Sequence, residues 1–307
     1  MSWKEDSLHR WLQRELKPRG LAAGIGNDAA VLRERIERPV VCADQALEGV
    51  HFEPGARAAL VGRKACARAL SDLAASAATP RAVLLTLRAP RSESEQRLRG
   101  LIRAVASEAQ RHGASLVGGD LACGPGPLSL SVSALGDLGA RTRPVSRAHA
   151  RAGQVLVATG PFGGSLLGRH LRIEPRFAAG RWLTELGATA MMDVSDGLAL
   201  DLSRIARASR VALYVGTVPI HRDARRRAKH TGRSALSHAL FDGEDHELVA
   251  TLPAAAVARA VRQARRRFPG FAVLGNVRRG EGVWLPRAED SDELVRYDGR
   301  GGWIHGA

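Results

Sequence analysis

Short apolar runs, several of which end at a glycine or an acidic residue, recur along the whole chain and alternate with longer, helix-like stretches. The runs at 39–44, 81–88 and 114–120 have the length of short buried strands. Residues 58–78 and 93–112 have the length and composition of helices. The second half of the chain repeats this mixture. Strands and helices mixed in both halves predict α/β and α+β architecture, with mixed sheets flanked by helices.

The chain has 307 residues, which suits two domains. A polar, basic stretch at 139–153 predicts a linker, so we expect an N-terminal domain over 1–139 and a C-terminal domain over 140–307. Residues 128–135 alternate apolar side chains with serines, which is the period of a strand with one small, polar face. Such a strand fits a sheet or a subunit interface, and it equally fits a half-exposed position.

The charge of the chain is strongly positive but evenly spread. Lysine and arginine number 46 against 31 acidic residues, giving +15, and the arginines run from end to end. A nucleic-acid-binding protein usually concentrates its basic residues and adds aromatic side chains that stack on bases, whereas aromatic residues here make up only 4%. We therefore interpret the charge as a general arginine bias rather than a nucleic-acid surface, although it favours anionic substrates such as phosphates.

Other protein classes are disfavoured by local features. Cys42, Cys66 and Cys123 form no CxxC pair and are odd in number, so neither a disulfide framework nor a zinc site is expected. No apolar run is long and charge-free enough to span a bilayer. The first residues, MSWKEDSLHRW, include acids and lack the apolar region of a secretory signal. We expect a cytoplasmic protein with no membrane association.

Acidic residues stand where apolar segments end, often beside glycine, in a chain that is otherwise basic. They are Asp28, Asp44, Asp72, Asp120, Asp193, Asp196, Glu244, Asp245 and Glu247. Each has an ordinary alternative, such as a helix N-cap for Asp28 or the polar side of a helix for Asp72. Carboxylates that meet at strand ends repel one another, and Mg²⁺ removes that cost because it binds oxygen ligands and substrate phosphates together. Taken together, the acids predict a Mg²⁺–phosphate site.

A glycine-rich stretch, GPFGGSLLG at 160–168, follows a predicted strand. Its backbone N–H groups are candidates for holding a phosphate. The stretch matches neither GxxxxGK[ST] nor GxGxxG, and a structural turn is the simpler interpretation. The residues by themselves thus predict two domains and a Mg²⁺–phosphate site, but no particular reaction.

The ordered motifs GIGNDAAVL, ADQALEGVHF, LVGGD, MMDVSDGLALDL and DGEDHELVATL resemble the bacterial thiamine-monophosphate kinase family. That family belongs to the superfamily of aminoimidazole ribonucleotide synthetase and selenophosphate synthetase, and the match runs from about Gly24 to Trp303. The resemblance implies the two-domain aminoimidazole ribonucleotide synthetase-like fold and a homodimer. It also implies ATP- and Mg²⁺-dependent phosphorylation of thiamine monophosphate to thiamine diphosphate, a step of thiamine diphosphate biosynthesis.

The resemblance also implies roles for single residues. The implied Mg²⁺ ligands are Asp28, Asp44, Asp72, Asp120, Asp193 and Asp196. The implied ATP contacts are Arg147 and Ser195, and the implied contacts with thiamine monophosphate are His51, Glu244 and Trp303. His51 also fits a core or turn histidine, and Trp303 a packed tail. Because the attacking phosphate oxygen is already ionised, we expect no catalytic side chain, only metals and positioning for a direct in-line transfer.

The chain departs from the family pattern around these residues. An acid is replaced at Asn27 and Gly164, two hydroxyl residues at Cys42 and Ala43, two threonines at Leu121 and Ala122, a glycine at Asp242, a tyrosine at His246 and an ATP-contacting tyrosine near Ile102 and Arg103. We interpret the chain as a divergent kinase. Two alternatives stay open: a related ATP-dependent enzyme with another small substrate, and a catalytically inactive paralogue that binds through its arginine-rich surface.

Overall fold

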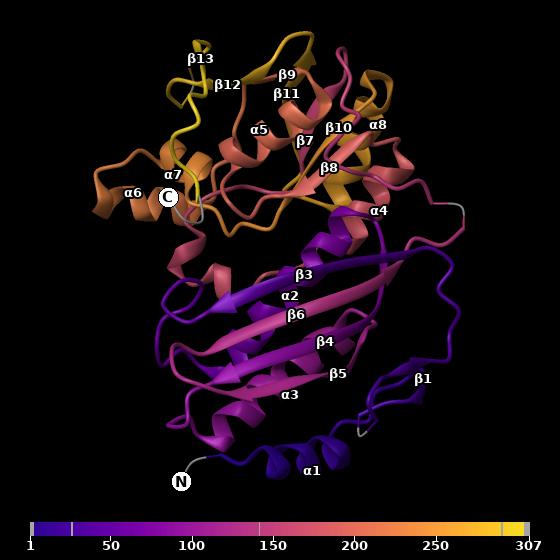
Figure 1. The fold of residues 1–307 in the computed structure, drawn as a ribbon. Helices are drawn as coiled ribbons and strands as arrows, with labels where there is room; N and C mark the ends of the chain where they lie inside the picture. Colours follow the sequence, from indigo (N-terminus) through magenta and orange to yellow (C-terminus); the bar gives the residue numbers. More distant parts are fainter. Residues whose placement is uncertain (1–2, 26, 141, 290, 304–307) are drawn as a thin grey trace. The chain divides into compact units, whose positions relative to one another are not determined.

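The computed structural model describes residues 3–25, 27–140, 142–289 and 291–303 (Figure 1). The chain forms two compact units. Unit 1 comprises Met1–Leu73, Ala78–Thr142 and Leu171–Ile173, and unit 2 comprises Ala74–Ala77, Arg143–His170 and Glu174–Ala307. The chain therefore passes between the units more than once. The prediction that the N-terminal and C-terminal domains have different roles stays a prediction.

A four-stranded sheet forms the body of unit 1. Its strands, in spatial order, are β3 (Pro39–Leu47), β6 (Ser129–Asp137), β4 (Thr79–Ala89) and β5 (Ser115–Cys123). Helices α2 (Ala58–Ala75) and α3 (Glu95–Arg111) lie on one face of the sheet (Figure 1). β4 and β5 are parallel, and the α3 crossover between them supplies the long connection that a parallel pair requires.

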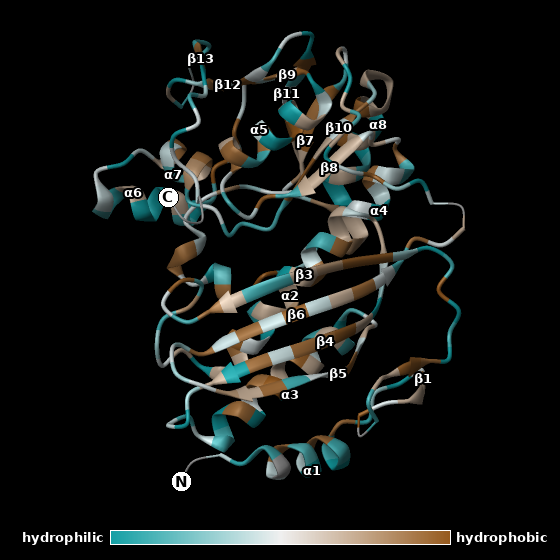
Figure 2. Ribbon diagram, viewed as in Figure 1, coloured by the Kyte–Doolittle hydropathy of each residue, from teal (hydrophilic) through white to brown (hydrophobic). Residues whose placement is uncertain are grey.

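The two faces of this sheet differ in exposure. On the helix side Leu130, Val132 and Leu85 are buried, because they pack under α2 and α3. On the opposite face Val41 is 71% exposed and Leu84 is 44% exposed. The predicted alternation over 128–135 is confirmed, since buried and half-buried residues alternate along β6 (Figure 2). The open face therefore carries apolar side chains among small polar ones.

The N-terminal segment adds α1 (Glu5–Glu15) and the short antiparallel pair β1 (Leu21–Ala23) and β2 (Val31–Leu32). α1 is amphipathic and buries Trp11 against α3, where the guanidinium groups of Arg99 and Arg103 lie 5.4 and 5.0 Å from the indole ring centre. These cation–π contacts and the burial of Trp11 fix one face of α1 to unit 1.

A seven-stranded, mostly antiparallel sheet forms the centre of unit 2. Its strands, in spatial order, are β13 (Leu294–Arg296), β12 (Gly282–Pro286), β9 (Ala212–Val215), β11 (Ala272–Arg278), β7 (Val155–Ala158), β10 (Leu248–Leu252) and β8 (Ala190–Asp193). The short helical turns η1 (Ser165–Leu167) and η2 (Arg169–Leu171) follow β7. The mixed α/β architecture expected for the second half is confirmed.

Helices flank the sheet of unit 2 in two separate apolar cores. One core contains side chains of α5 (Leu198–Ser209) and α7 (Ala235–Phe241). The other contains Trp182 and Leu183 of α4 and Ala260 and Ala264 of α8. The bounds of the remaining helices are Phe177–Glu185 for α4, Arg222–Thr231 for α6 and Ala254–Arg267 for α8. Two cores on one sheet explain why β7 is apolar along its whole length and β10 is buried along its whole length.

The stretch predicted as a linker, 139–153, is only partly one. From Arg143 onward the chain belongs to unit 2, where Val145 and Ala150 are buried in the two cores. The carbonyl of Ser146 also accepts a hydrogen bond from the N–H of Met191 at 2.9 Å. Burial of these two apolar side chains holds this part of the polar stretch against unit 2. None of the helices in the described ranges has the length and hydropathy that crossing a bilayer requires.

Candidate active site

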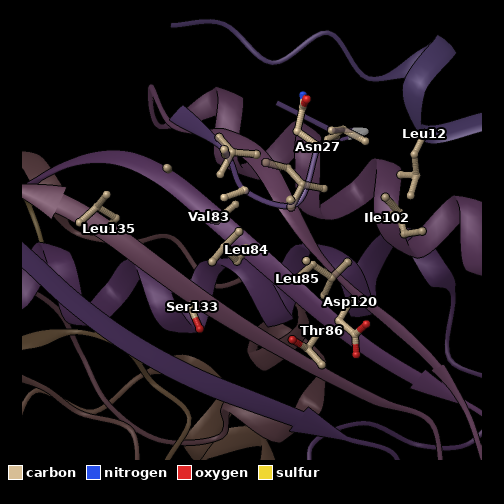
Figure 3. A pocket seen from close by; sticks show the side chains of 18 of the residues that line it. Leu12, Asn27, Val83, Leu84, Leu85, Thr86, Ile102, Asp120, Ser133 and Leu135 are labelled. Carbon is tan, nitrogen blue, oxygen red and sulfur yellow. The ribbon is translucent and has the colours of Figure 1, made fainter. Parts of the chain in front are cut away.

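A cavity of about 920 Å³ in unit 1 contains two of the predicted acids, Asp28 and Asp120. Asp120 lies on β5 directly across from Thr86 of β4, and both side chains line the cavity (Figure 3). Apolar side chains from α1, α3 and the strands line the rest, among them Leu12 and Ile102 (Figure 3). The cavity therefore combines apolar walls with carboxylates, the composition expected of a small-molecule site.

Asp44 and Asp72 lie elsewhere in unit 1. The strand register pairs Asp44 with Val132 on the helix side, whereas Thr86 and Asp120 point to the opposite face. Asp44 Oδ1 lies 3.2 Å from Arg68 Nη2 of α2, the helix that also carries Asp72. Unit 1 thus holds its four predicted acids in two groups, on the two sides of its sheet.

Two departures from the family pattern have structural consequences here. Cys42 Sγ donates a hydrogen bond to the carbonyl oxygen of Ala69 in α2 at 3.1 Å, so this side chain contributes to strand–helix packing. Ile102 is 1% exposed and lines the cavity in the region where an aromatic hydroxyl was expected. An aliphatic side chain keeps the apolar contact and loses the hydrogen bond.

His51 lies in the turn that follows β3. Its Nδ1 accepts a hydrogen bond from the N–H of Leu47 at 3.1 Å, and the buried ammonium group of Lys64 donates to its carbonyl oxygen at 2.6 Å. These contacts match the turn-histidine interpretation and hold the ring in one orientation. The predicted contact of His51 with substrate stays a prediction.

In unit 2 the loop Asp193–Gly197 connects the end of β8 to the start of α5. Asp201, one turn into the helix, reaches back and accepts hydrogen bonds from the N–H groups of Ser195 and Asp196, both at 3.0 Å. Arg204 contacts both Asp201 and Asp196, at 2.6 Å from Asp196 Oδ2. Burial raises the pKa of Asp201 to about 7, although the charge of Arg204 acts against this rise. The contacts of Asp201 and Arg204 therefore hold the Asp193–Gly197 loop in one conformation.

The segment Asp242–Glu247, which we call the acidic strap, pairs with this loop. The N–H of Glu244 donates to the carbonyl of Ser195 at 2.7 Å, and the N–H of His246 donates to that of Val194 at 2.8 Å. Glu244 and His246 both have left-handed backbone conformations, with φ of 56° and 52°. Such values strain residues other than glycine and persist only where neighbouring contacts hold them.

His246 is almost fully buried between two carboxylates. Its Nδ1 lies 3.0 Å from Asp193 Oδ2, and its Nε2 lies 3.4 Å from Glu244 Oε2. Burial alone would lower the pKa of His246, but the hydrogen bonds to Asp193 and Glu244 outweigh it and raise the pKa to about 9. The imidazole is therefore cationic at neutral pH and partly neutralises a predicted metal ligand and a predicted substrate contact.

The glycine loop at 160–168 does not offer its N–H groups to a phosphate. The N–H of Gly163 donates to both oxygens of Asp245 at 3.0 Å, and the N–H of Gly164 donates to Asp242 Oδ2 at 3.1 Å. The Ser165 hydroxyl donates to the carbonyl of Gly243 at 2.6 Å. The phosphate-cradle interpretation is wrong for these two amides, because carboxylates already occupy them and would repel a phosphate. The loop is a structural turn.

The C-terminal tail also joins this site. The N–H of Trp303 donates to the carbonyl of Asp196 at 2.8 Å, and the indole is 49% exposed. Arg147 is exposed, and its carbonyl accepts a hydrogen bond from the Ser209 hydroxyl at 3.1 Å. No described contact joins its guanidinium to Ser195. Unit 2 thus brings together Asp193, Ser195, Asp196, Glu244 and Trp303, whereas Arg147 stands apart.

Sequence reasoning missed the residues that hold this site in shape. Asp201 and Arg204 were not singled out, although an acid in the first turn of a helix, followed three residues later by an arginine, is a recognisable signal. No local sequence pattern indicated which groups Asp242 and Asp245 bind, because the glycine-loop amides that they accept hydrogen bonds from lie about eighty residues earlier in the chain.

The predicted acids suit a hard divalent cation by their chemistry, since carboxylate oxygens are the ligands that Mg²⁺ prefers. Within the described ranges, however, no three or more metal-ligating side chains are already gathered as a cluster. Asp44, Asp193 and Asp196 each have a cationic partner instead. The donor set therefore fits Mg²⁺, provided that the cation shares these carboxylates with the resident side chains or displaces them.

Comparison with known proteins identifies the superfamily to which this fold belongs. Residues 26–138 match the family described as AIR synthase related protein, N-terminal domain. A structure of AaThiL complexed with AMPPCP and TMP shares the fold, with a TM-score of 0.74, 24% identity and coverage of 98% of this chain and 95% of that chain. The fold is that of the AIR synthase superfamily, as expected.

Relatives with higher sequence identity identify the family within this superfamily. The thiamine-monophosphate kinase of Rhodopirellula baltica is 40% identical over 241 residues, which are 75% of each chain. The crystal structure of thiamine-monophosphate kinase from Stenotrophomonas maltophilia K279a has 33% identity and a TM-score of 0.75, covering 92% of this chain and 96% of that one. The chain belongs to the thiamine-monophosphate kinase family.

Proposed function

We propose that the protein is a thiamine-phosphate kinase, which transfers the terminal phosphoryl group of ATP to thiamine monophosphate and yields thiamine diphosphate and ADP. The observation that carries this proposal is the meeting of Asp193, Ser195, Asp196, Glu244 and Trp303 around one loop of unit 2. Family membership at up to 40% identity supports the same reaction. Its place is thiamine diphosphate biosynthesis in the cytoplasm.

The transfer is a problem of charge and alignment. Both reactants are polyanions, and the attacking phosphate oxygen needs no base, so positioning and neutralisation supply the catalysis. Asp193 and Asp196 in unit 2, and in unit 1 the separate groups Asp28 with Asp120 and Asp44 with Asp72, would hold Mg²⁺ ions, which when bound neutralise phosphate charge. The hydroxyl of Ser195 donates a hydrogen bond to a phosphate oxygen of ATP, and the guanidinium group of Arg147 adds a positive charge beside the phosphates. Asp201 and Arg204 keep the loop in the required shape.

Glu244 and Trp303 suit the acceptor. Thiamine carries a cationic heterocycle, which an anionic carboxylate and the face of an indole both attract. Trp303 is half exposed beside the Asp196 carbonyl, and the Glu244 backbone is bonded to Ser195, so both side chains border the same loop. His51 is proposed as a further contact from unit 1. An in-line geometry then requires the acceptor phosphate opposite the leaving ADP.

The cavity of unit 1 is the proposed place for the adenosine part of ATP. Its volume of about 920 Å³ lies at the upper end of the range for small-molecule sites. Leu12, Ile102 and Leu116 offer apolar contact to a base, and Asp28 and Asp120 are the carboxylates of the same cavity that would hold Mg²⁺. A nucleotide has both an apolar base and an anionic tail, which this division of the lining accommodates.

We also propose a homodimer that covers the open face of the unit 1 sheet. Val41 and Leu84 are large apolar residues with 71% and 44% exposure on that face. Across β6, Ser133 separates Ala43 from Leu84, so the surface is flat and made of small and aliphatic groups. Val41, Leu84 and Ser133 also line the cavity proposed for adenosine, so a second copy would bury this surface and form an outer wall of that cavity, which favours association.

The decisive experiment incubates the full chain with ATP, Mg²⁺ and thiamine monophosphate and identifies products by phosphorus NMR. We expect ADP and a new diphosphate signal, and the Asp196→Asn variant should lower turnover by orders of magnitude while remaining folded. Folded wild-type protein that forms neither product would overturn the proposal.

A second candidate function is phosphorylation of another small phosphorylated acceptor. The cationic His246 next to Glu244 favours it, because this charge weakens the attraction of Glu244 for cationic thiamine. A panel of phosphorylated acceptors under the same conditions separates the two. Faster turnover of a neutral acceptor than of thiamine monophosphate would favour the second function.

A further inference from the structure

Asp242 is a buried carboxylate at the C-terminal end of α7, a position where the helix dipole disfavours negative charge. Its side chain is only 2% exposed and is held by four groups. These are the N–H of Gly164 at 3.1 Å, Arg227 Nη1 at 3.2 Å, Arg233 Nη1 at 3.5 Å and His238 Nδ1 at 2.9 Å. Such complete pairing leaves this carboxylate engaged entirely within the protein.

Gly164, which faces Asp242, has no room for a side chain. Its φ of +69° is in the left-handed region, and a Cβ atom there would lie 2.3 Å from the carbonyl carbon of Asp223 and 2.4 Å from the nitrogen of Ala224. Gly164 and Asp242 are hydrogen-bonded to each other, although they stand far apart in the sequence.

We propose that Asp242 acts as a positioning residue for Glu244, because it anchors the acidic strap to the glycine loop. The inference rests on the proposed function, because it takes Glu244 as the contact for the acceptor.

The geometry of the strap explains how a distant carboxylate positions Glu244. Asp242 and Asp245 bind the glycine loop, whereas Glu244 and His246 bind the Asp193–Gly197 loop. The strap is thus fastened on both sides. Glu244 lies between these two sets of contacts with a strained φ of 56°. Asp242, together with Asp245 and the hydrogen bond from Ser165 to Gly243, opposes the relaxation of this strain.

The arrangement also predicts which of the two KM values changes when Asp242 is replaced. Glu244 serves the acceptor, whereas the ATP contact Ser195 lies in the Asp193–Gly197 loop, which Asp201 and Arg204 hold in shape without any described contact to Asp242. Loss of the Asp242 anchor should therefore raise the KM for thiamine monophosphate and leave the KM for ATP nearly unchanged. A general loss of structure would change both constants.

The test compares full-length wild-type protein with Asp242→Gly, Asp242→Asn and the control Asp137→Asn. Asp137 is a matched control because it is buried, accepts hydrogen bonds from the N–H groups of Arg38 and Gly139, and lies in unit 1. Hydrogen exchange at the Gly164 amide and the two KM values are measured for each protein.

We expect Asp242→Gly to speed Gly164 amide exchange at least tenfold and to raise the KM for thiamine monophosphate about tenfold, with the KM for ATP within about twofold. Asp242→Asn, which keeps an acceptor oxygen, should show a smaller effect, and it replaces the glycine variant if that one does not fold. Asp137→Asn should change neither.

Unchanged exchange at Gly164 in both Asp242 variants overturns the anchor. An equal rise of both KM values overturns the positioning role. If wild-type protein does not phosphorylate thiamine monophosphate, the proposed function fails, and the exchange rates alone then decide for or against the anchor.

Discussion

Replacing His246 by glutamine should remove a specific part of the pH dependence of stability. In the folded protein His246 is cationic between Asp193 and Glu244, and its pKa is raised from 6.5 to about 9. Glutamine has a similar length and still forms hydrogen bonds, but it carries no charge. The substitution therefore tests the charge of His246 more than its volume.

The magnitude follows from the raised pKa. Because the folded state holds the proton more tightly, the stabilisation is fully present below the unfolded pKa of 6.5 and is lost as the pH rises through about 9. One pKa unit corresponds to ~1.4 kcal/mol, so the contribution of His246 is about 3 kcal/mol. This is a large fraction of the stability of a typical domain.

Urea unfolding at about pH 6 and about pH 9.5, both in EDTA, measures this contribution. EDTA matters because Mg²⁺ would compete for Asp193. Between the two pH values the free energy of unfolding of wild-type protein should fall by about 3 kcal/mol more than that of His246→Gln. His230→Gln, at an exposed histidine of α6, is the control and should behave like wild type. Parallel pH profiles for wild type and His246→Gln would refute the charged histidine.

Three further predictions concern packing, assembly and the loop. Gly180→Ala places a Cβ 2.2 Å from the carbonyl oxygen of Ala74, so calorimetry should show a loss of about 1–3 kcal/mol, whereas Gly216→Ala, with open space around it, should show little change. Val41→Glu should convert the proposed dimer to a monomer in analytical ultracentrifugation, and an unchanged mass would contradict that interface. Asp201→Ala leaves two loop N–H groups without their acceptor, so turnover should fall at least tenfold in a steady-state assay while circular dichroism stays native.

Local patterns in the sequence predicted most elements correctly, because strand and helix periods depend on near neighbours. The stretch predicted as a helix at 93–112 forms α3 over Glu95–Arg111, and all but the first residue of the alternating run at 128–135 lies within β6. The order of motifs predicted the superfamily fold, which the comparisons confirm. The placement of acids at strand ends also pointed to the Asp193–Gly197 loop.

The sequence could not predict which acids share a face or which are already paired. A strand register decides that Asp44 and Asp120 point to opposite sides of one sheet, and a shift of one residue would reverse this. The glycine loop resembled a phosphate site because its amide partners, Asp242 and Asp245, lie about eighty residues away.

The chain by itself thus determined its elements, its family and the residues available for chemistry, since these follow from local periods and motif order. Only the tertiary structure decided how the charges are matched. Asp242 meets Gly164, Asp201 caps the Asp193–Gly197 loop, and His246 lies between Asp193 and Glu244. The reason is physical: the free energy of a buried charge depends on the donors and charges that folding brings around it, and distance along the chain does not record them.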